Sequence, residues 1–234
     1  MLILKKKSMT TLKDVKNNQQ VLEFIKKTEK TLSALSFTDH GLRHLNLVAD
    51  RAIYIAKAIG ISERGQELSG IAAFCHDMGN FLSRSHHNYF AALLFHQIFK
   101  DDFPADEMAT IMQAISNHDK QQEDINFVSK VAAIVVLADK SDVHRSRVTV
   151  KKMKDIKSDI HDRVNYATTK SELKVENPPA GGKKRIILNL EIDTNFVPIL
   201  EYFEIFTDRM VFCRRAAEFL GYNFGLEINK IQLL

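Results

Sequence analysis

Residues 71–80 read IAAFCHDMGN and carry the strongest signal for the fold in this chain. A run of apolar and small residues leads directly into a His-Asp pair, and a glycine follows. A carboxylate at the end of a helix faces the negative end of the helix dipole, at a cost of about 0.3–1 kcal/mol. Because a bound dication would reverse that cost, His76 and Asp77 are candidate metal ligands. We also expect Gly79 to end this helix in the left-handed conformation.

Helical spacing of apolar residues extends outward from this stretch in both directions. The pattern predicts buried helices over residues 39–58, 62–78, 85–99, 104–117 and 128–137. The last of them is apolar on nearly every face, which is typical of the most buried helix of a domain. A more polar helix over residues 11–35 is expected to cap this group.

Histidine is the unusual component of the chain, which has 234 residues, nine histidines and two unclustered cysteines. A metal site would therefore consist of imidazole and carboxylate rather than thiolate. The His-Asp pair occurs three times, so the pair alone is weak evidence. Position separates the candidates, because His44 lies on the inward face of its helix and Asp139 follows ten nearly unbroken apolar residues. Four helices would bring the following residues to one point: His44, His76, Asp77, His118 and Asp139.

This ordered set resembles the HD superfamily of metal-dependent phosphohydrolases. The resemblance covers about residues 38 to 147 and includes the strings HLNLVA at 44–49, FCHDMG at 74–79 and VLADK at 136–140. It implies an HD-type helical bundle in which one metal is held by His44, His76, Asp77 and Asp139.

The resemblance also implies a second metal, because family members with two metals add histidines between the second and last of these blocks. His87 and His118 fall at the corresponding places, and Asp77 would bridge the two ions. His86 is the neighbouring alternative to His87, and His40, one turn before His44, is an alternative ligand or a supporting residue. The ligand set leaves Fe, Mn, Zn, Ni and Mg undistinguished.

The chain departs from the common family pattern at Asn80, where many members have a lysine. Other cations would then bind the substrate phosphate, and the candidates are Arg84, Lys140, Arg145 and Arg147. For the last two, a salt bridge to a local acid such as Asp142 is an equally weighted alternative. We predict catalytic roles for His76, Asp77 and Lys140.

The pattern of charged and apolar residues changes after about residue 147. A basic stretch over residues 151–157 is expected to be solvated. Alternating apolar residues then predict a hairpin, a long helix over 198–220 and a third strand over 222–228. The fold prediction is mainly α, an HD-type bundle with a small C-terminal β-β-α-β appendage. The predicted domains are an N-terminal helical cap (1–35), a metal-binding helical domain (36–150) and the α+β appendage (151–234). The long helix has more apolar faces than one small sheet covers, so it packs on the helical domain or on a second copy in a homodimer.

The function that the resemblance implies is hydrolysis of a phosphate ester, of a nucleotide or dinucleotide, by a metal-activated water. Two alternatives stay open: a di-iron oxygenase on the same ligand set, and a non-catalytic module for ligand binding or dimerisation. The expected partner is a small phosphorylated substrate, with neither a membrane nor nucleic acid. The unclustered cysteines and an N-terminus without a signal-peptide pattern favour a cytoplasmic location.

Overall fold

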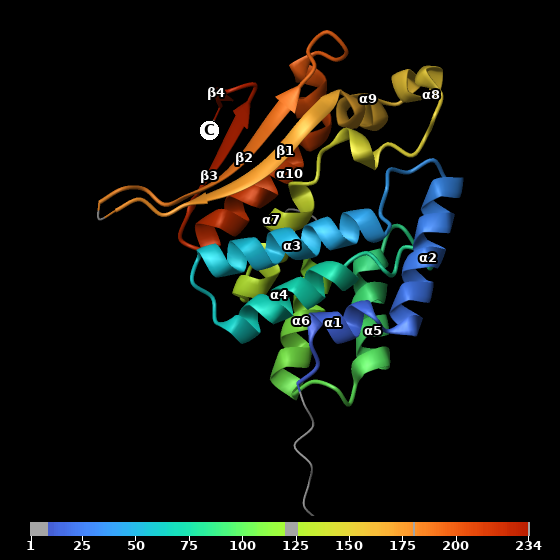
Figure 1. The fold of residues 1–234 in the computed structure, drawn as a ribbon, viewed down its shortest axis with the longest axis vertical. Helices are drawn as coiled ribbons and strands as arrows, with labels where there is room; N and C mark the ends of the chain where they lie inside the picture. The colour runs from blue at the N-terminus through green and yellow to red at the C-terminus, as the bar shows by residue number, and fades with distance from the viewer. Residues whose placement is uncertain (1–8, 120–125, 180, 234) are drawn as a thin grey trace, which may run out of the picture.

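Five helices form the bundle that the apolar spacing predicts. The computed structural model describes residues 9–119, 126–179 and 181–233 (Figure 1). The bundle consists of α3 (Leu42–Ala58), α4 (Glu63–Cys75), α5 (His87–Phe99), α6 (Ala105–Asn117) and α7 (Lys130–Lys140). Helix α7 packs against α3, α4 and α6, while α5 packs against α6. All residues of α7 after Lys130 are buried, Asp139 and Lys140 included, which confirms α7 as the central helix.

The N-terminal segment is two helices rather than the single one predicted. Helix α1 (Leu12–Lys16) and helix α2 (Gln19–Ala34) are separated at Asn18, whose side chain accepts hydrogen bonds from the backbone at the start of α2. Asparagine favours such a cap because its short side chain reaches the free N–H groups of the first turn. Val15 and Ile25 place both helices on the core. Residues 1–8 of the predicted cap lie outside the described residues.

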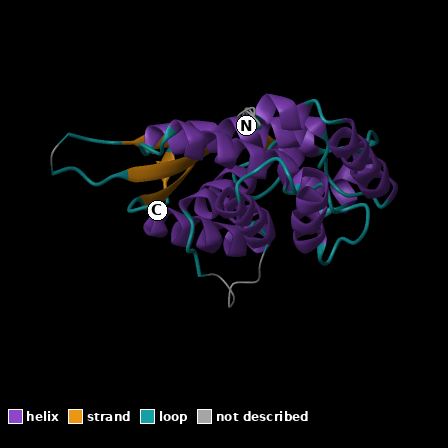
Figure 2. Cartoon of the chain, turned by 90° about the horizontal axis from the view of Figure 1, so that it is seen from below, coloured by secondary structure: helices purple, strands orange, loops and turns teal. Residues whose placement is uncertain are grey.

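The C-terminal part contains the predicted hairpin, helix and third strand. Strands β1 (Thr168–Glu176) and β2 (Arg185–Ile192) pair antiparallel, and β3 (Asn223–Ile228) pairs parallel to β2. A parallel pair needs a long crossover, which is provided by α10 (Ile199–Phe219). Figure 2 shows the strands gathered on one side of the molecule. The mainly α fold with a small C-terminal sheet is confirmed.

Four short elements of this part were missing from the prediction. They are a 3-10 turn, η2 (Arg145–Arg147), two helices, α8 (Met153–Ser158) and α9 (Ile160–Ala167), and a final strand, β4 (Ile231–Gln232). Helix α8 lies in the basic stretch and buries only Ile156. One inward residue is too few to produce a detectable period.

Helix α10 joins the sheet to the bundle. It packs on β2 and β3 on one side and on α7 on the other (Figure 1). One hydrophobic cluster accordingly extends from Val15 in α1 to Ile228 in β3. Of the two packing alternatives for this helix, the structure shows packing on the helical bundle. Homodimer formation through this region stays a prediction. Among the described residues, no helix is both long and apolar enough to cross a membrane.

Gly79 is required for close packing and not for a left-handed turn. The glycines with positive φ are Gly60, Gly181 and Gly221, so our prediction for Gly79 is wrong. A Cβ at Gly79 would lie 2.3 Å from the His87 carbonyl oxygen and 2.6 Å from the Ala91 nitrogen. The turn after α4 therefore contacts the backbone of α5 directly, and this contact sets the position of His87.

We predict that Gly79→Ala lowers the free energy of unfolding by about 1–3 kcal/mol, because α5 must move to admit the methyl group. Gly70→Ala is the matched control inside α4, where the new methyl group would meet the flexible tips of Ile53 and Leu12. Its gain in helix propensity offsets part of that crowding, so its change should stay below about 1 kcal/mol. Urea unfolding curves measure both values. Equal losses in the two variants would contradict this account.

Candidate metal centre

The six side chains predicted as metal ligands converge on one buried point. His44 lies in the first turn of α3 and Asp139 in the last turn of α7. The others lie at helix ends, with His76 and Asp77 directly after α4, His87 at the start of α5 and His118 directly after α6. None of the six is more than 7% exposed. Burial of so many polar groups in an apolar bundle requires that they satisfy one another or bind a ligand.

Each of the four histidines has one ring nitrogen engaged, and the other faces the centre. The Nδ1 atoms of His76, His87 and His118 lie 2.6–2.8 Å from the backbone carbonyl three residues earlier in the chain. The Nδ1 atom of His44 lies 2.8 Å from Asp142 Oδ2. Carbonyl and carboxylate oxygens only accept, so Nδ1 carries the hydrogen. Nε2 is then the atom of each ring that could bind a metal, as in a typical histidine-ligated site.

Two imidazole nitrogens lie beside one oxygen of Asp77. Asp77 Oδ2 lies 3.2 Å from His76 Nε2 and 3.6 Å from His44 Nε2. Asp139 Oδ1 completes the group, 3.4 Å from His44 Nε2 and 3.6 Å from His76 Nε2. Two imidazoles and two carboxylates therefore meet at this point, where a single divalent ion could bind all four.

The second oxygen of Asp77 faces a different pair of histidines. Asp77 Oδ1 lies 3.2 Å from His87 Nε2 and 3.6 Å from His118 Nε2, and these two nitrogens are 3.1 Å apart. The side chains of Asp77, His87 and His118 form one potential metal-binding group, those of His44, His76 and Asp77 form a second, and those of His76, His118 and Asp139 form a third. Asp77 thus belongs to the first two groups.

The charges of the centre are strongly coupled. Burial disfavours an imidazolium, but Asp77 and Asp139 outweigh it and raise the pKa of His76 to about 10. Burial dominates at His118, where it lowers the pKa to about 4. Burial also disfavours both carboxylates, yet the charge and hydrogen bonds of neighbouring groups hold the pKa of Asp77 and of Asp139 well below its usual value. The centre therefore holds two carboxylates in the ionised form that metal binding requires.

The two alternative histidines do not join the group. His40 is buried, but its Nδ1 contacts the Thr38 carbonyl oxygen at 2.6 Å and its Nε2 lies 3.2 Å from a guanidinium nitrogen of Arg147. Both ring nitrogens of His40 are thus engaged away from the carboxylates. His86 is exposed at the N-terminal end of α5. Within the described part of the chain, neither belongs to a potential metal-binding group.

Asp142 supports the centre from behind, a role that the sequence analysis missed. Its Oδ2 accepts from His44 Nδ1 and, at 2.9 Å, from Arg43 Nη2. Burial disfavours its charge, but the hydrogen bond to His44 and the charges of Arg147 and Arg43 hold the pKa of Asp142 below its usual value. Such a carboxylate fixes the orientation and the tautomer of the imidazole. Asp142 lies three residues after Asp139, and this spacing could have indicated from the sequence that its carboxylate lies near the centre.

Lys140 forms ion pairs with carboxylates of the centre. Its Nζ lies 2.8 Å from Asp139 Oδ2 and 3.1 Å from Asp119 Oδ1. Burial disfavours its charge, but Asp139 and Asp119 together raise the pKa of Lys140. Lys140 therefore supplies a positive charge here and retains its proton. Asp119, which is not among the residues predicted from the sequence, lies 3.7 Å from His87 Nε2.

Asn80 connects the metal centre to Arg84. Its side-chain nitrogen donates to Asp77 Oδ1 at 2.9 Å, and its side-chain oxygen accepts from Arg84 Nη1 at 3.0 Å. The residue at which this chain departs from the family pattern thus positions an arginine beside the ligands. Arg84 lines a small cavity over the centre together with His87 and Lys140.

The other predicted phosphate-binding residues have different surroundings. Arg147 is buried, lines the same cavity and donates to the carbonyl oxygens of Asp39 and Asp142. Arg145 is exposed, with its guanidinium 5.4 Å from the ring of Tyr166. It lines neither this cavity nor the larger one beside it. We therefore leave Arg145 out of the substrate site that we propose.

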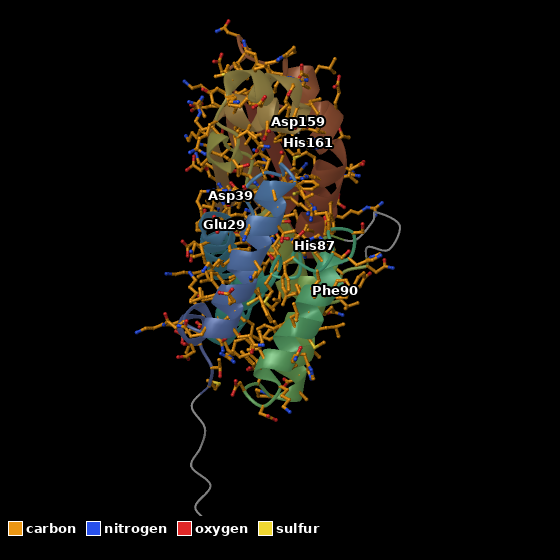
Figure 3. The ribbon with its side chains drawn as sticks, turned by 90° about the vertical axis from the view of Figure 1, so that its right-hand side faces the viewer. Glu29, Asp39, His87, Phe90, Asp159 and His161 are labelled. Carbon is orange, nitrogen blue, oxygen red and sulfur yellow. The ribbon has the colours of Figure 1, made fainter. Side chains whose placement is uncertain are left out.

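The larger cavity has a volume of about 390 Å³ and adjoins the first, since both are lined by His40, Arg84, Arg147 and Arg209. Its far wall consists of residues from α9 and the residue before it: Asp159, His161, Asp162 and Asn165. Figure 3 shows Asp159 and His161 above His87 on one side of the molecule. The C-terminal part of the chain thus forms one wall of the space beside the metal centre.

A comparison with known families agrees with this geometry. The family model of the HD domain matches residues 41–143, which run from just before α3 to just after α7 and contain all six candidate ligands. This segment of the chain therefore matches the HD domain. Most members are metal-dependent phosphohydrolases, and HD domains bind divalent metals. The donor set found here fits such ions. No curated protein matches the chain.

We predict that Asp142→Asn weakens metal binding about 10- to 100-fold, because the variant keeps the shape of the side chain but removes the charge behind His44. Asp50→Asn, an exposed residue of the same helix as His44, should leave the affinity unchanged. Competition titration with a chromophoric chelator measures both, and circular dichroism checks the fold. Wild-type affinity in Asp142→Asn would rule out the supporting role.

A second prediction concerns the pH dependence of stability through Asp162. Burial and the charge of Asp159 raise the pKa of Asp162 to about 6, whereas the unfolded chain has an ordinary value of about 4. The folded state therefore binds this proton more tightly, and its stabilising effect, complete below pH 4, is lost as pH rises to 6. The unfolding free energy of the wild type should fall across this window relative to that of Asp162→Asn. The exposed Asp155→Asn should follow the wild type, and parallel curves for all three proteins would refute the assignment.

Proposed function

We propose that this protein is a metal-dependent phosphohydrolase that cleaves a phosphate ester of a nucleotide or dinucleotide with an activated water. The observation that supports it best is the common orientation of four Nε2 atoms toward two buried carboxylates. A packing role alone would not require four imidazoles to direct their Nε2 atoms to one point. Phosphoryl transfer, by contrast, needs mainly concentrated positive charge and fixed positions.

The arrangement supports two ions that share Asp77. One ion would be held by His44, His76, Asp77 and Asp139, and the other by Asp77, His87 and His118. When bound, divalent ions lower the pKa of a water and neutralise the oxygens of a phosphoryl group. The ligand set is compatible with Fe, Mn, Zn, Ni or Mg.

The protein's own residues would position and balance the charges of the reaction. Arg84, held by Asn80, can donate to a phosphate oxygen beside His87. Lys140 offsets the outer oxygen of Asp139 and, as a group that keeps its proton, acts as a charge and not as a base. Water adds to phosphorus while the bond to the leaving oxygen breaks, and the proton of the water ends on the leaving alcohol. This balance requires no nucleophilic side chain, and the thiol of Cys75 is buried with a raised pKa.

We expect metal-loaded protein to release phosphate or a phosphomonoester from members of a nucleotide panel, and His76→Ala to lower kcat/KM at least about 100-fold. A loss of about 3 kcal/mol of transition-state stabilisation already corresponds to that factor. His96→Ala, an exposed histidine of α5, is the matched control and should retain activity.

Bound metal should be counted in the same samples by elemental analysis. Oxygen consumption that requires iron, without phosphate release, would replace this proposal with an oxygenase. Retention of full phosphohydrolase activity by His76→Ala would show that the reaction occurs elsewhere. Absence of any turnover with a fully occupied metal centre would favour a non-catalytic role.

A further inference from the structure

An arginine from outside the matched domain lies at the boundary between the two cavities. Arg209 belongs to α10, which packs on α7 and thereby lies next to the helix that carries Asp139 and Lys140. Arg209 lines both the small cavity over the metal ligands and the cavity of about 390 Å³ beside it. The C-terminal part therefore contributes a cation to the site.

Arg209 has no carboxylate or hydrogen-bond partner of its own among the described residues. Its guanidinium carbon lies 4.8 Å from the ring centre of Phe206, one turn earlier on the same helix. Phe206 is almost completely buried, so this contact holds the arginine in place. The acids that favour its charge, Asp139 and Asp119, are each already paired with Lys140.

Two further arginines face Arg209 across the same boundary. Burial and the charges of Arg147 and Arg84 lower the pKa of Arg209, although the group stays protonated at neutral pH. Three guanidinium groups that converge on one space repel each other, and partial burial removes the water that would screen them. An anion at their meeting point would relieve this repulsion and form charge-assisted hydrogen bonds.

This anion is not the phosphoryl group under attack. That group must lie against the metal ligands, where Arg84 Nη1 is only 3.2 Å from His87 Nδ1. Arg209 contacts none of the six ligands by any hydrogen bond or ion pair within the described ranges, and it also lines the outer cavity. Arg209 therefore lies where the small cavity over the ligands meets the outer cavity.

We propose that Arg209 binds a second phosphate of the substrate, directly linked to the phosphate under attack, and that the substrate is therefore a nucleotide with at least two adjacent phosphates. This inference rests on the proposed function and adds the substrate class. The cavity beyond Arg209 receives the nucleoside. Phe37 and Phe206 supply apolar surface there, and Asp162 and Asn165 supply hydrogen-bonding groups. Cavities of a few hundred Å³ with such a mixture are typical of small-molecule sites.

The test is a binding comparison that does not depend on turnover. The probes are methylenediphosphonate, a non-hydrolysable mimic of two linked phosphates, and methylphosphonate, its single-phosphate counterpart. Both are titrated calorimetrically into metal-loaded protein. The wild type should bind the diphosphonate at least about 10-fold more tightly, since one charge-assisted contact accounts for about 1.4 kcal/mol or more.

Arg209→Gln should lose this preference and bind methylphosphonate as the wild type does. Arg209→Lys should restore part of it, because the charge returns without the planar fork. Arg214→Gln is the matched control, since Arg214 is exposed on the same helix and faces Glu218. It should retain the full preference, and metal content should be equal in all four proteins.

The outcomes separate this inference from the proposed function. A diphosphonate preference that persists in Arg209→Gln, or that is absent from the wild type, overturns the role of Arg209 while phosphate-ester turnover can still stand. If the preference for the diphosphonate depends on Arg209 but the protein turns over no phosphate ester, the role of Arg209 is supported and the proposed phosphohydrolase function is contradicted. Equal losses in Arg209→Gln and Arg214→Gln would reduce the effect to net charge and overturn the inference.

Discussion

The structure depends on the burial of two ionised carboxylates, Asp77 and Asp139, inside an apolar helical bundle. Burying an isolated ionised carboxylate in such surroundings costs several kcal/mol of folding free energy. Only opposite charges and hydrogen bonds at close range offset this cost. The four imidazoles and Lys140 provide these interactions. The groups that stabilise the two ionised carboxylates also direct their own nitrogen and oxygen atoms toward one point. A divalent ion needs such a convergence of ligand atoms.

The helices are placed to satisfy this constraint. Helices α4 and α6 both end at the centre, and the histidine after each donates to a carbonyl of the last turn, a group that has no partner within the helix. The absence of a side chain at Gly79 lets α5 approach and deliver His87. Behind the centre, Asp142 accepts from both His44 and Arg43. The polar network is thus continuous from the candidate ligands to the surrounding loops.

Most of the bundle could be predicted from the sequence because each signal was local, and the six side chains named as candidate ligands lie close together in the structure. The bundle helices have several inward apolar residues, and Asp139 stands out because nothing in its apolar neighbourhood explains it. The errors have equally definite causes. Gly79 is required by a contact with α5 that no local pattern records, and α8 buries a single residue. From the sequence, Asp142 was considered only as a salt-bridge partner of a nearby arginine. Its contact with His44 joins residues 98 positions apart, and no local pattern indicates such a contact.

From the sequence alone, the class of fold and the bundle helices follow, because the apolar spacing lies along single elements, and the candidate ligands follow from that spacing together with the family resemblance. Only the tertiary structure shows which nitrogen of each histidine faces inward, which cations line the cavities beside the centre and how the C-terminal part contributes to their walls. Arg209 shows the difference most clearly. On its helix it is one charged residue among several, and it becomes part of the site only because α10 packs against α7. Packing between distant segments brings their side chains together in space, and the distance along the chain contains no information about that contact.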